Sequence, residues 1–270
     1  MNKLFLKLRT FNALFLLAMR LDFMTGIHFF LKYLWIVLLC MTYRFIFSAA
    51  LLGKEIPLGN DHIGFPLFLI SGLALMRLVL TSLKLFEDTL ALFKKFGLAE
   101  WIKISPTSWW EILISNAAWK GLVLLSEMGV LVIAAHYLIG TPAKLFFQLR
   151  VIVTILLMML AYGGLGMMIS GIILLLRHGA FLFPLVNQIS VAFGGVLFPT
   201  YLLPGGFDVL TSLMPITFAL KSVRACLIGA PIRLEMAAAV PLALLALLFL
   251  LTGCLLLNFA LRWAQKNGTL

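Results

Sequence analysis

The chain has 270 residues, of which 63% are hydrophobic and only 11% charged, and its formal net charge is +11. Soluble domains combine about half apolar with about a quarter charged residues, so this composition excludes an ordinary water-soluble protein. The basic residues are scattered between apolar stretches, whereas a nucleic-acid partner needs a solvated basic face. Long apolar runs without alternation also exclude a membrane β-barrel. We therefore expect residues 1–270 to form a single all-α membrane domain.

Residues 1–30 mix basic side chains with Leu, Phe and Met at near-helical spacing. This pattern predicts an amphipathic helix that lies in the membrane interface, and a longer, tilted first span is the alternative. Lys3, Lys7 and Arg9 before an apolar run are also typical of a signal peptide, but no small-residue cleavage site follows them. We therefore expect this segment to be retained.

A helix that crosses a membrane needs roughly 20 apolar residues. Six apolar runs, bounded by charged residues or by Pro and Gly, meet this requirement. They are Tyr33–Leu52, Ile63–Leu85, Ile112–Ile139, Val151–Leu176, Ala180–Phe198 and Met236–Leu261. The sequence thus predicts six transmembrane helices after the interfacial helix.

Two predicted connections are much longer than the roughly 2 to 8 residues that are common between helices. Residues 86–111 follow the second span, and residues 199–235 follow the fifth. Prolines and glycines divide the second connection and leave two short helices, Phe207–Leu213 and Ile216–Ile228. Neither is long enough to cross, and irregular backbone at membrane depth must be buried in protein or face a cavity. The pattern predicts a re-entrant helical hairpin, with an ordinary interfacial loop as the alternative.

The positions of Lys and Arg predict the orientation, because loops that stay in the cytoplasm are enriched in them. With the amino terminus inside, 12 of the 21 Lys and Arg residues fall on the cytoplasmic side, six fall outside and three lie within spans. Both termini and residues 86–111 are therefore predicted to be cytoplasmic, and residues 199–235 external. The expected location is a bacterial inner (plasma) membrane.

Motifs for ATP binding and for metal catalysis are missing from the sequence. It contains no GxxxxGK[ST] loop to cradle ATP phosphates, so any ATP and Mg²⁺ would be bound by a partner chain. The four histidines lie far apart without an HExxH pair, which argues against a zinc site. We expect no cofactor, no metal site and no catalytic residue in this chain.

Ionisable residues within spans are unusual, because each costs about 2.5 to 3.5 kcal/mol at the bilayer centre on insertion scales. Arg44 and Arg77 lie in the first two predicted spans, and Lys120 and Glu127 are seven residues apart in the third, on one helix face. One interpretation makes the two arginines line a path for an anionic or amphipathic substrate. The other is snorkelling or pairing between helices, which we favour for Lys120 and Glu127.

Residues 97–113, in the first long connection, read GLAEWIKISPTSWWEIL. This stretch resembles the G-T-L-E-x-L…S-P-x-S…E-I-L pattern of ABC type-2 transporter permeases, except that Leu98-Ala99 stands where that family often has Thr-Leu. In the second long connection, residues 195–199, 202–204 and 214–217 with Arg224 resemble the family's G-x-x-F-P…L-P…P-x-T…R segment. With six predicted spans and an amphipathic amino terminus, the resemblance covers nearly the whole chain.

The resemblance implies a permease that works with a second permease copy, identical or homologous, and with two copies of a separate ATPase. The complex would export a lipid, a drug or a lipid-linked glycan. The cytoplasmic connection would contact the ATPase through Phe93, Phe96, Gly97, Glu100, Trp101, Ser105 and Pro106. The external hairpin would form a gate at Phe198, Pro199, Leu203, Pro204, Pro215 and Arg224.

Two other classes of function stay open from the residues alone. An integral membrane enzyme acting on lipid-linked substrates would use an external carboxylate such as Asp61 or Asp208, although general acid and base catalysis needs a convergent pair. A secondary transporter would need an acidic residue near the midplane of the membrane, and only Glu127 is suitable.

Overall fold

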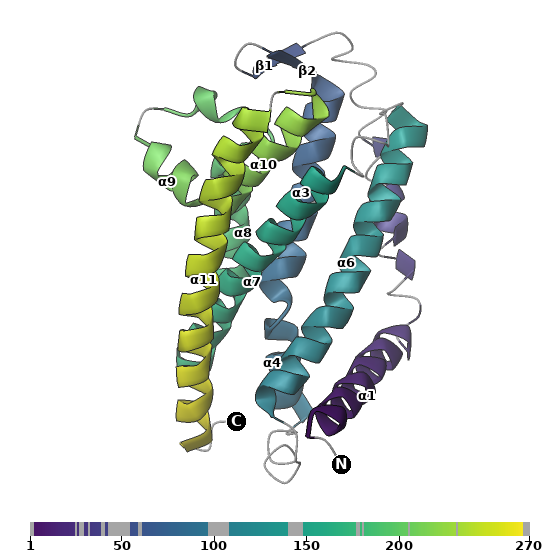
Figure 1. Ribbon diagram of the computed structural model, residues 1–270, viewed down its shortest axis with the longest axis vertical. Helices are drawn as coiled ribbons and strands as arrows, with labels where there is room; N and C mark the ends of the chain where they lie inside the picture. The colour runs from purple at the N-terminus through teal and green to yellow at the C-terminus, as the bar shows by residue number, and fades with distance from the viewer. Residues whose placement is uncertain are drawn as a thin grey trace.

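The computed structural model describes residues 3–24, 26, 30–31, 33–38, 41–42, 55–58, 61–96, 108–139, 148–176, 179, 181–204, 206–230 and 232–266. Within these ranges the regular elements are helices, apart from one two-stranded hairpin. Long helices run side by side along the long axis of the molecule (Figure 1). Helix α1 (Lys3–Met24) begins and helix α11 (Ile232–Lys266) ends at the same end. We call this the terminal end, and the opposite end, where β1 and β2 lie, the hairpin end.

Among the described residues, four stretches of helix are long and apolar enough to cross a membrane: Leu67–Ala91, Trp109–Ala134, Leu149–Leu176 and Arg233–Lys266. They fall in α3 (Phe65–Lys84) with the start of α4 (Glu87–Phe96), α6 (Trp109–Ile139), α7 (Leu149–Leu176) and α11. The protein is therefore a multi-pass membrane protein, and four of the six predicted spans correspond to helices that are long and apolar enough to cross.

The other two predicted spans are not confirmed. Helix α8 (Leu182–Phe193) has 12 residues and is about 18 Å long, which is shorter than the roughly 30 Å hydrocarbon core. The predicted first span lies mostly outside the described residues, although 33–38 and 41–42 are helical. A total of six spans stays a prediction.

The hairpin end contains the irregular part of the chain. Strands β1 (Glu55–Leu58) and β2 (Asp61–Gly64) pair antiparallel, with Ile56 opposite Ile63. The second predicted span was therefore wrong at its start, because Ile63 belongs to β2 and α3 begins only at Phe65, with a proline in its first turn. The purely helical prediction likewise missed this hairpin.

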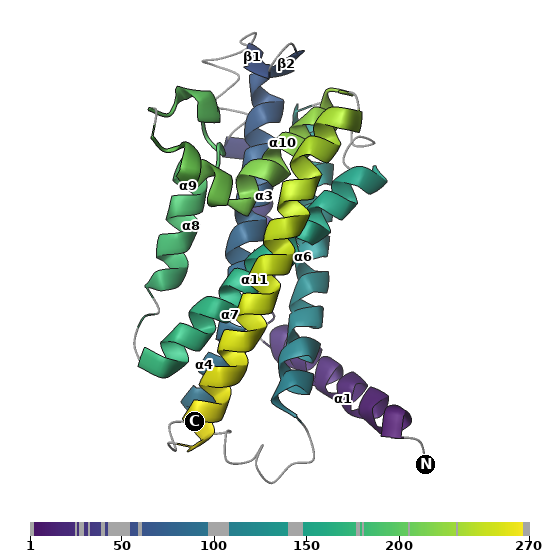
Figure 2. The same cartoon turned by 60° about the vertical axis from the view of Figure 1, so that its left-hand side comes forward.

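The segment after α8 contains the 3₁₀ turn η2 (Thr200–Leu202), α9 (Asp208–Leu213) and α10 (Pro215–Leu227). Helices α9 and α10 confirm the two short helices predicted at Phe207–Leu213 and Ile216–Ile228, within one residue at each end. Both lie near the hairpin end (Figures 1 and 2). Their side chains differ in environment, since α9 has no buried residue whereas α10 has ten.

Helices α7 and α11 approach each other closely where both carry glycine. A Cβ atom added to Gly253 would lie 2.4 Å from the carbonyl oxygen of Gly164, and one added to Gly164 would lie 2.5 Å from the backbone of Phe249. Small residues of this kind let helix backbones approach each other inside a membrane, where packing replaces the hydrophobic drive. The main core, between α3, α6, α7, α8 and α10, includes the fully buried Leu78, Tyr162 and Phe183.

Helices α1 and α4 lie at the terminal end (Figure 1). Helix α1 packs on α6, where the ring of Trp119 meets Phe15 edge-on and Phe23 at an angle. Helix α4 follows α3 after a two-residue turn, and Phe86 and Leu90 are buried beside Leu257 of α11. Helix α4 therefore continues the bundle toward the segment predicted to couple to an ATPase.

Candidate functional site

The Arg224 side chain is the most deeply buried cation among the described residues of the hairpin end, with 5% of its surface exposed. Its Nε donates a hydrogen bond to Ser71 Oγ at 3.2 Å, and Nη2 donates to the Phe68 carbonyl oxygen at 3.1 Å. Nη1 donates to the carbonyl oxygen of Gly195 at 3.0 Å. Because a buried charge needs such partners, the guanidinium joins α10 to α3 and to the turn after α8.

The backbone at Gly195 makes this arrangement possible. Its φ angle is +78°, in the left-handed region that favours glycine. The turn ends α8 and leaves the carbonyl oxygens of Gly195 and Val196 outside a helix, where Arg224 reaches both. The turn also abuts α3, since a Cβ atom on Gly72 would lie 2.4 Å from the Val196 oxygen. Gly195 therefore provides a hydrogen-bond acceptor for Arg224, and both residues belong to the same predicted motif.

The remaining residues of the predicted external gate belong to the same irregular segment. Pro199 is buried just before η2, Leu203 is half-buried after it, and Phe198 and Pro204 are exposed. Pro215 is buried and occupies the first turn of α10, a position where its missing N–H is not needed. The structure brings Arg224 and Gly195 into contact, and a gating role of the six predicted residues stays a prediction.

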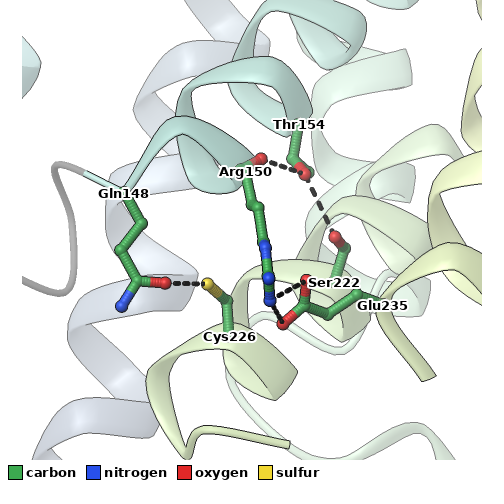
Figure 3. A network of polar contacts seen from close by, with 6 residues as sticks. All are labelled: Gln148, Arg150, Thr154, Ser222, Cys226 and Glu235. Atoms are coloured by element: carbon green, nitrogen blue, oxygen red, sulfur yellow. Dashed lines mark hydrogen bonds and ion pairs between the residues drawn. The ribbon is translucent and has the colours of Figure 1, made fainter. Parts of the chain in front are cut away.

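A second polar network holds α10 against α7 and α11 (Figure 3). Arg150 Nη1 on α7 lies 3.4 Å from both carboxylate oxygens of Glu235 on α11, whose side chain is buried. Thr154 Oγ1 and Ser222 Oγ are 3.0 Å apart, and the Cys226 thiol donates to Gln148 Oε1 at 2.8 Å. Together with Arg224, these contacts fix both sides of α10.

This network was not predicted from the sequence. The predicted topology could have suggested one part of it, because Arg150 and Glu235 directly precede two predicted spans whose first residues lie on the same side of the membrane. Opposite charges in such positions are candidates for a pair between neighbouring helices. The polar contacts of Ser222 and Cys226 have no comparable signal in the sequence.

Three of the four ionisable residues predicted within spans belong to the described residues, and these three are paired. Arg77 Nε on α3 donates to Glu127 Oε2 on α6 at 3.2 Å, and the Glu127 side chain is only 3% exposed. Lys120, on the same face of α6, forms an ion pair with Asp88 of α4. These pairs border a cavity of about 290 Å³. Pairing is thus confirmed for Lys120 and Glu127, Arg77 is both paired and exposed to a cavity, and Arg44 lies outside the described residues.

The predicted ATPase-coupling residues are only partly described. Phe93 and Phe96 belong to α4, while Gly97, Glu100, Trp101, Ser105 and Pro106 lie outside the described residues. The structure does describe both ends of the predicted segment 86–111, which are α4 and the start of α6.

Helix α6 begins with a capping box that sequence analysis missed, although its S-x-x-E signal was present. Ser108 Oγ accepts a hydrogen bond from the Glu111 amide at 3.2 Å, and Glu111 Oε2 accepts one from the Ser108 amide at 3.2 Å. One residue away, Trp110 Nε1 donates to Asn258 Oδ1 of α11 at 2.7 Å. Farther along α6, the side-chain amide nitrogen Nδ2 of Asn116 donates a hydrogen bond to Thr89 Oγ1 of α4. Both ends of the predicted coupling segment are therefore fixed to the bundle.

The comparison with protein families agrees with this arrangement. A family model described as "ABC-2 type transporter" matches residues 30–228, which include the first long connection, most of the second and Arg224. No curated protein matches the chain. The family is one of membrane subunits for transport, and the carboxylates considered for an enzyme, Asp61 and Asp208, lie on separate elements, β2 and α9. Because the matched region covers most of its length, the chain belongs to the ABC-2 type transporter family.

Proposed function

We propose that this chain is the permease subunit of an exporter and moves a hydrophobic or amphipathic substrate outward. ATP and Mg²⁺ are bound and used by two copies of a separate ATPase, and a second permease copy, identical or homologous, completes the path. The observation that carries this proposal is the family match over residues 30–228. The assignment of ATP binding to a separate chain is supported by the sequence, since it contains no GxxxxGK[ST] loop.

The proposed topology has six spans, an interfacial amino-terminal helix and a re-entrant hairpin at residues 199–235. Helices α9 and α10 have 6 and 13 residues, so they are about 9 and 20 Å long and too short to cross and return. Helix α10 packs against α3, α7 and α11, which is the protein cover that backbone breaks at membrane depth need. Orientation rests on the excess of Lys and Arg on the side of both termini, which makes the terminal end cytoplasmic.

The outward face of α11 supports contact with lipid or with the second permease copy. Its exposed large apolar side chains recur at helical spacing: Val240, Leu244, Leu247, Leu251, Leu255 and Phe259. Exposed apolar surface of this extent is rare on soluble monomers and marks membrane or protein contact. In the proposed complex, hydrocarbon or the partner permease covers this face.

Residues 86–111 are the proposed coupling segment. It begins with Phe86 and α4 and ends with the Ser108–Glu111 capping box, at the end of the molecule where α1 begins. The contacts of Thr89 with Asn116 and of Trp110 with Asn258 tie its two ends to α6 and α11. A movement of the ATPase against Phe93, Phe96, Glu100 or Trp101 would therefore act directly on the spanning helices. At the other end, Arg224 and the turn at Gly195 are proposed to hold the external gate closed.

Co-purification tests this proposal. The tagged chain is produced together with a candidate ATPase subunit, recognised by its GxxxxGK[ST] loop, in a version with residues 92–103 and a version without them. The full chain should retain the ATPase on the affinity resin, and the deleted chain should insert into the membrane but lose it. Full retention of the ATPase by the deleted chain would contradict the proposed coupling segment.

A further inference from the structure

Helix α6 is joined to α3 and α4 by three polar contacts between side chains at different depths in the bundle. From the terminal end toward the hairpin end of α6, they are Asn116 with Thr89, Lys120 with Asp88, and Glu127 with Arg77. Asn116, Lys120 and Glu127 are four and seven residues apart, so they fall on one face of α6 and span roughly 16 Å of its length. The contacts therefore form a line that starts at α4, at the terminal end (Figure 1), and reaches into the membrane-spanning part of the bundle.

The two ion pairs among these contacts border the cavity of about 290 Å³ between α6 and the α3–α4 side of the bundle. Where a cavity separates two helices, their side chains lack the packing contacts that would otherwise hold them together. The ion pairs therefore provide the link across the cavity. Nearer the hairpin end, α3 and α6 both contribute to the main apolar core, for example with Leu75 and Leu131.

The helices on the two sides of the cavity differ in their continuity. Helix α6 is unbroken from Trp109 to Ile139, whereas a turn at residues 85–86 separates α4 from α3. A continuous helix moves largely as one rigid element, whereas a short turn between two helices can absorb a change in the angle between them. A displacement of α4 that reaches Lys120 would therefore be carried along α6 to Glu127, about 10 Å farther into the bundle.

The pair of Asp88 and Lys120 differs from the deeper pair in what it contributes to folding. The Asp88 side chain is 49% exposed and that of Lys120 is 19% exposed, and ion pairs that are partly open to solvent add little to the free energy of folding. The Glu127 side chain is only 3% exposed, so loss of its partner would disturb the fold itself. The connection between α4 and α6 can therefore be changed at Asp88 and Lys120 without unfolding the protein.

We infer that the ion pair of Asp88 and Lys120 transmits movement of α4 to α6. An ATPase that acts on α4 then shifts α6 against α3 at the pair of Arg77 and Glu127. In this role Asp88 and Lys120 are positioning residues, because they act through α6 and not on ATP. The inference rests on the proposed function, since it takes the ATPase to act on residues 86–111, and it assigns the transmission of that action to one pair of charges.

Charge reversal in the reconstituted complex tests the inference. The full chain is combined in proteoliposomes with a candidate ATPase subunit, recognised by its GxxxxGK[ST] loop. The measurements are the amount of ATPase that the tagged chain retains and the stimulation of ATP hydrolysis by the chain. Asp88→Lys and Lys120→Glu should each retain the ATPase but lower the stimulation roughly fivefold or more. The double variant restores the attraction between the two side chains and should recover most of the stimulation, and Lys120→Arg should keep it.

Two controls separate transmission from folding and from general charge effects. The single variants should unfold in detergent at nearly the same temperature as the unmodified chain. Arg262→Glu reverses an exposed cation of α11 at the same end of the molecule and should leave retention and stimulation unchanged.

Three results would overturn the inference: normal stimulation by either single variant, no recovery in the double variant, or loss of ATPase retention together with stimulation. If the unmodified chain neither retains nor stimulates the ATPase, the proposed function itself is contradicted and the inference is wrong with it.

Discussion

The guanidinium of Arg224 lies 3.5 Å from the centre of the Phe68 ring and also donates a hydrogen bond to the Phe68 carbonyl oxygen at 3.1 Å. The Arg224 side chain thus stacks on the ring of Phe68 and also binds the backbone of Phe68, which lies in the first turns of α3. The planar guanidinium of arginine can stack on a ring and donate several hydrogen bonds in fixed directions, whereas the ammonium group of lysine cannot do both. The contact makes the start of α3, the turn at Gly195 and α10 a single unit.

Loss of this contact should destabilise the fold. Arg224→Gln leaves buried carbonyl oxygens without donors, which costs about 1–3 kcal/mol per group, and Arg224→Lys keeps the charge but loses the fork and the stacking. We expect both variants to lower the unfolding temperature in detergent, with Arg224→Lys no more stable than Arg224→Gln. Lys221→Gln, an exposed change on the same helix, should have an effect within about 0.5 kcal/mol. Unfolding temperatures that are equal for Arg224→Gln and Lys221→Gln would contradict the role of Arg224.

The pair of Arg77 and Glu127 allows a double-mutant cycle. Removal of Arg77 leaves the Glu127 carboxylate, which is 3% exposed, buried without its partner, at a cost of about 3–5 kcal/mol, whereas replacement of both by apolar residues is often neutral. Arg77→Met should therefore destabilise the chain strongly, Glu127→Leu should do so less because the Arg77 side chain is 31% exposed, and the double variant should recover most of the loss of Arg77→Met. The measurement is thermal unfolding of the four proteins. Additive losses in the double variant would show that the two side chains are independent.

The contact of α7 with α11 predicts a strong effect from one methyl group. Gly253→Ala places a Cβ atom against the carbonyl oxygen of Gly164, and such overpacking costs about 1–3 kcal/mol. Gly129→Ala on α6 is the matched control, because nothing lies within 4 Å of its added Cβ. There the higher helix propensity of alanine should leave stability unchanged or raise it by up to about 1 kcal/mol. Thermal unfolding in detergent should separate the two variants, and equal stability of both would mean that the helices do not cross at Gly253.

The re-entrant hairpin predicts a pattern of labelling. In a background without the three native cysteines, single cysteines at Tyr201 and Arg233 should react in intact cells with a reagent that cannot cross the membrane. A cysteine at Val209 or Leu213 on α9 should react slowly, because these exposed apolar positions would face lipid. Uniform reaction along the segment would show an ordinary solvated loop.

The sequence predicted elements well where local chemistry determines them. Prolines and glycines around Pro204 and Pro215 mark the limits of α9 and α10, because proline restricts the backbone before and at its own position. Gly195 and Arg224 were identified by resemblance, but their contact was not, since 29 residues separate them. The pair of Arg150 and Glu235, 85 residues apart, depends in the same way on how α7 and α11 pack. The start of α3 was wrong by two residues because strand pairing with Glu55–Leu58 competes with the helix.

The proposed export function requires that this chain be coupled to an ATPase, and we propose that residues 86–111 make this contact. The most direct test is the rate of ATP hydrolysis by the reconstituted complex in proteoliposomes, for the unmodified chain, Glu100→Lys and Glu55→Lys. Both variants reverse one carboxylate, and Glu55 lies in β1 at the hairpin end, far from the proposed docking segment. We expect hydrolysis stimulated by the permease to be lost in Glu100→Lys, because a charge reversal at a docked interface repels its partner, and to be retained in Glu55→Lys. Full stimulation by Glu100→Lys, or equal loss in both variants, would contradict the account.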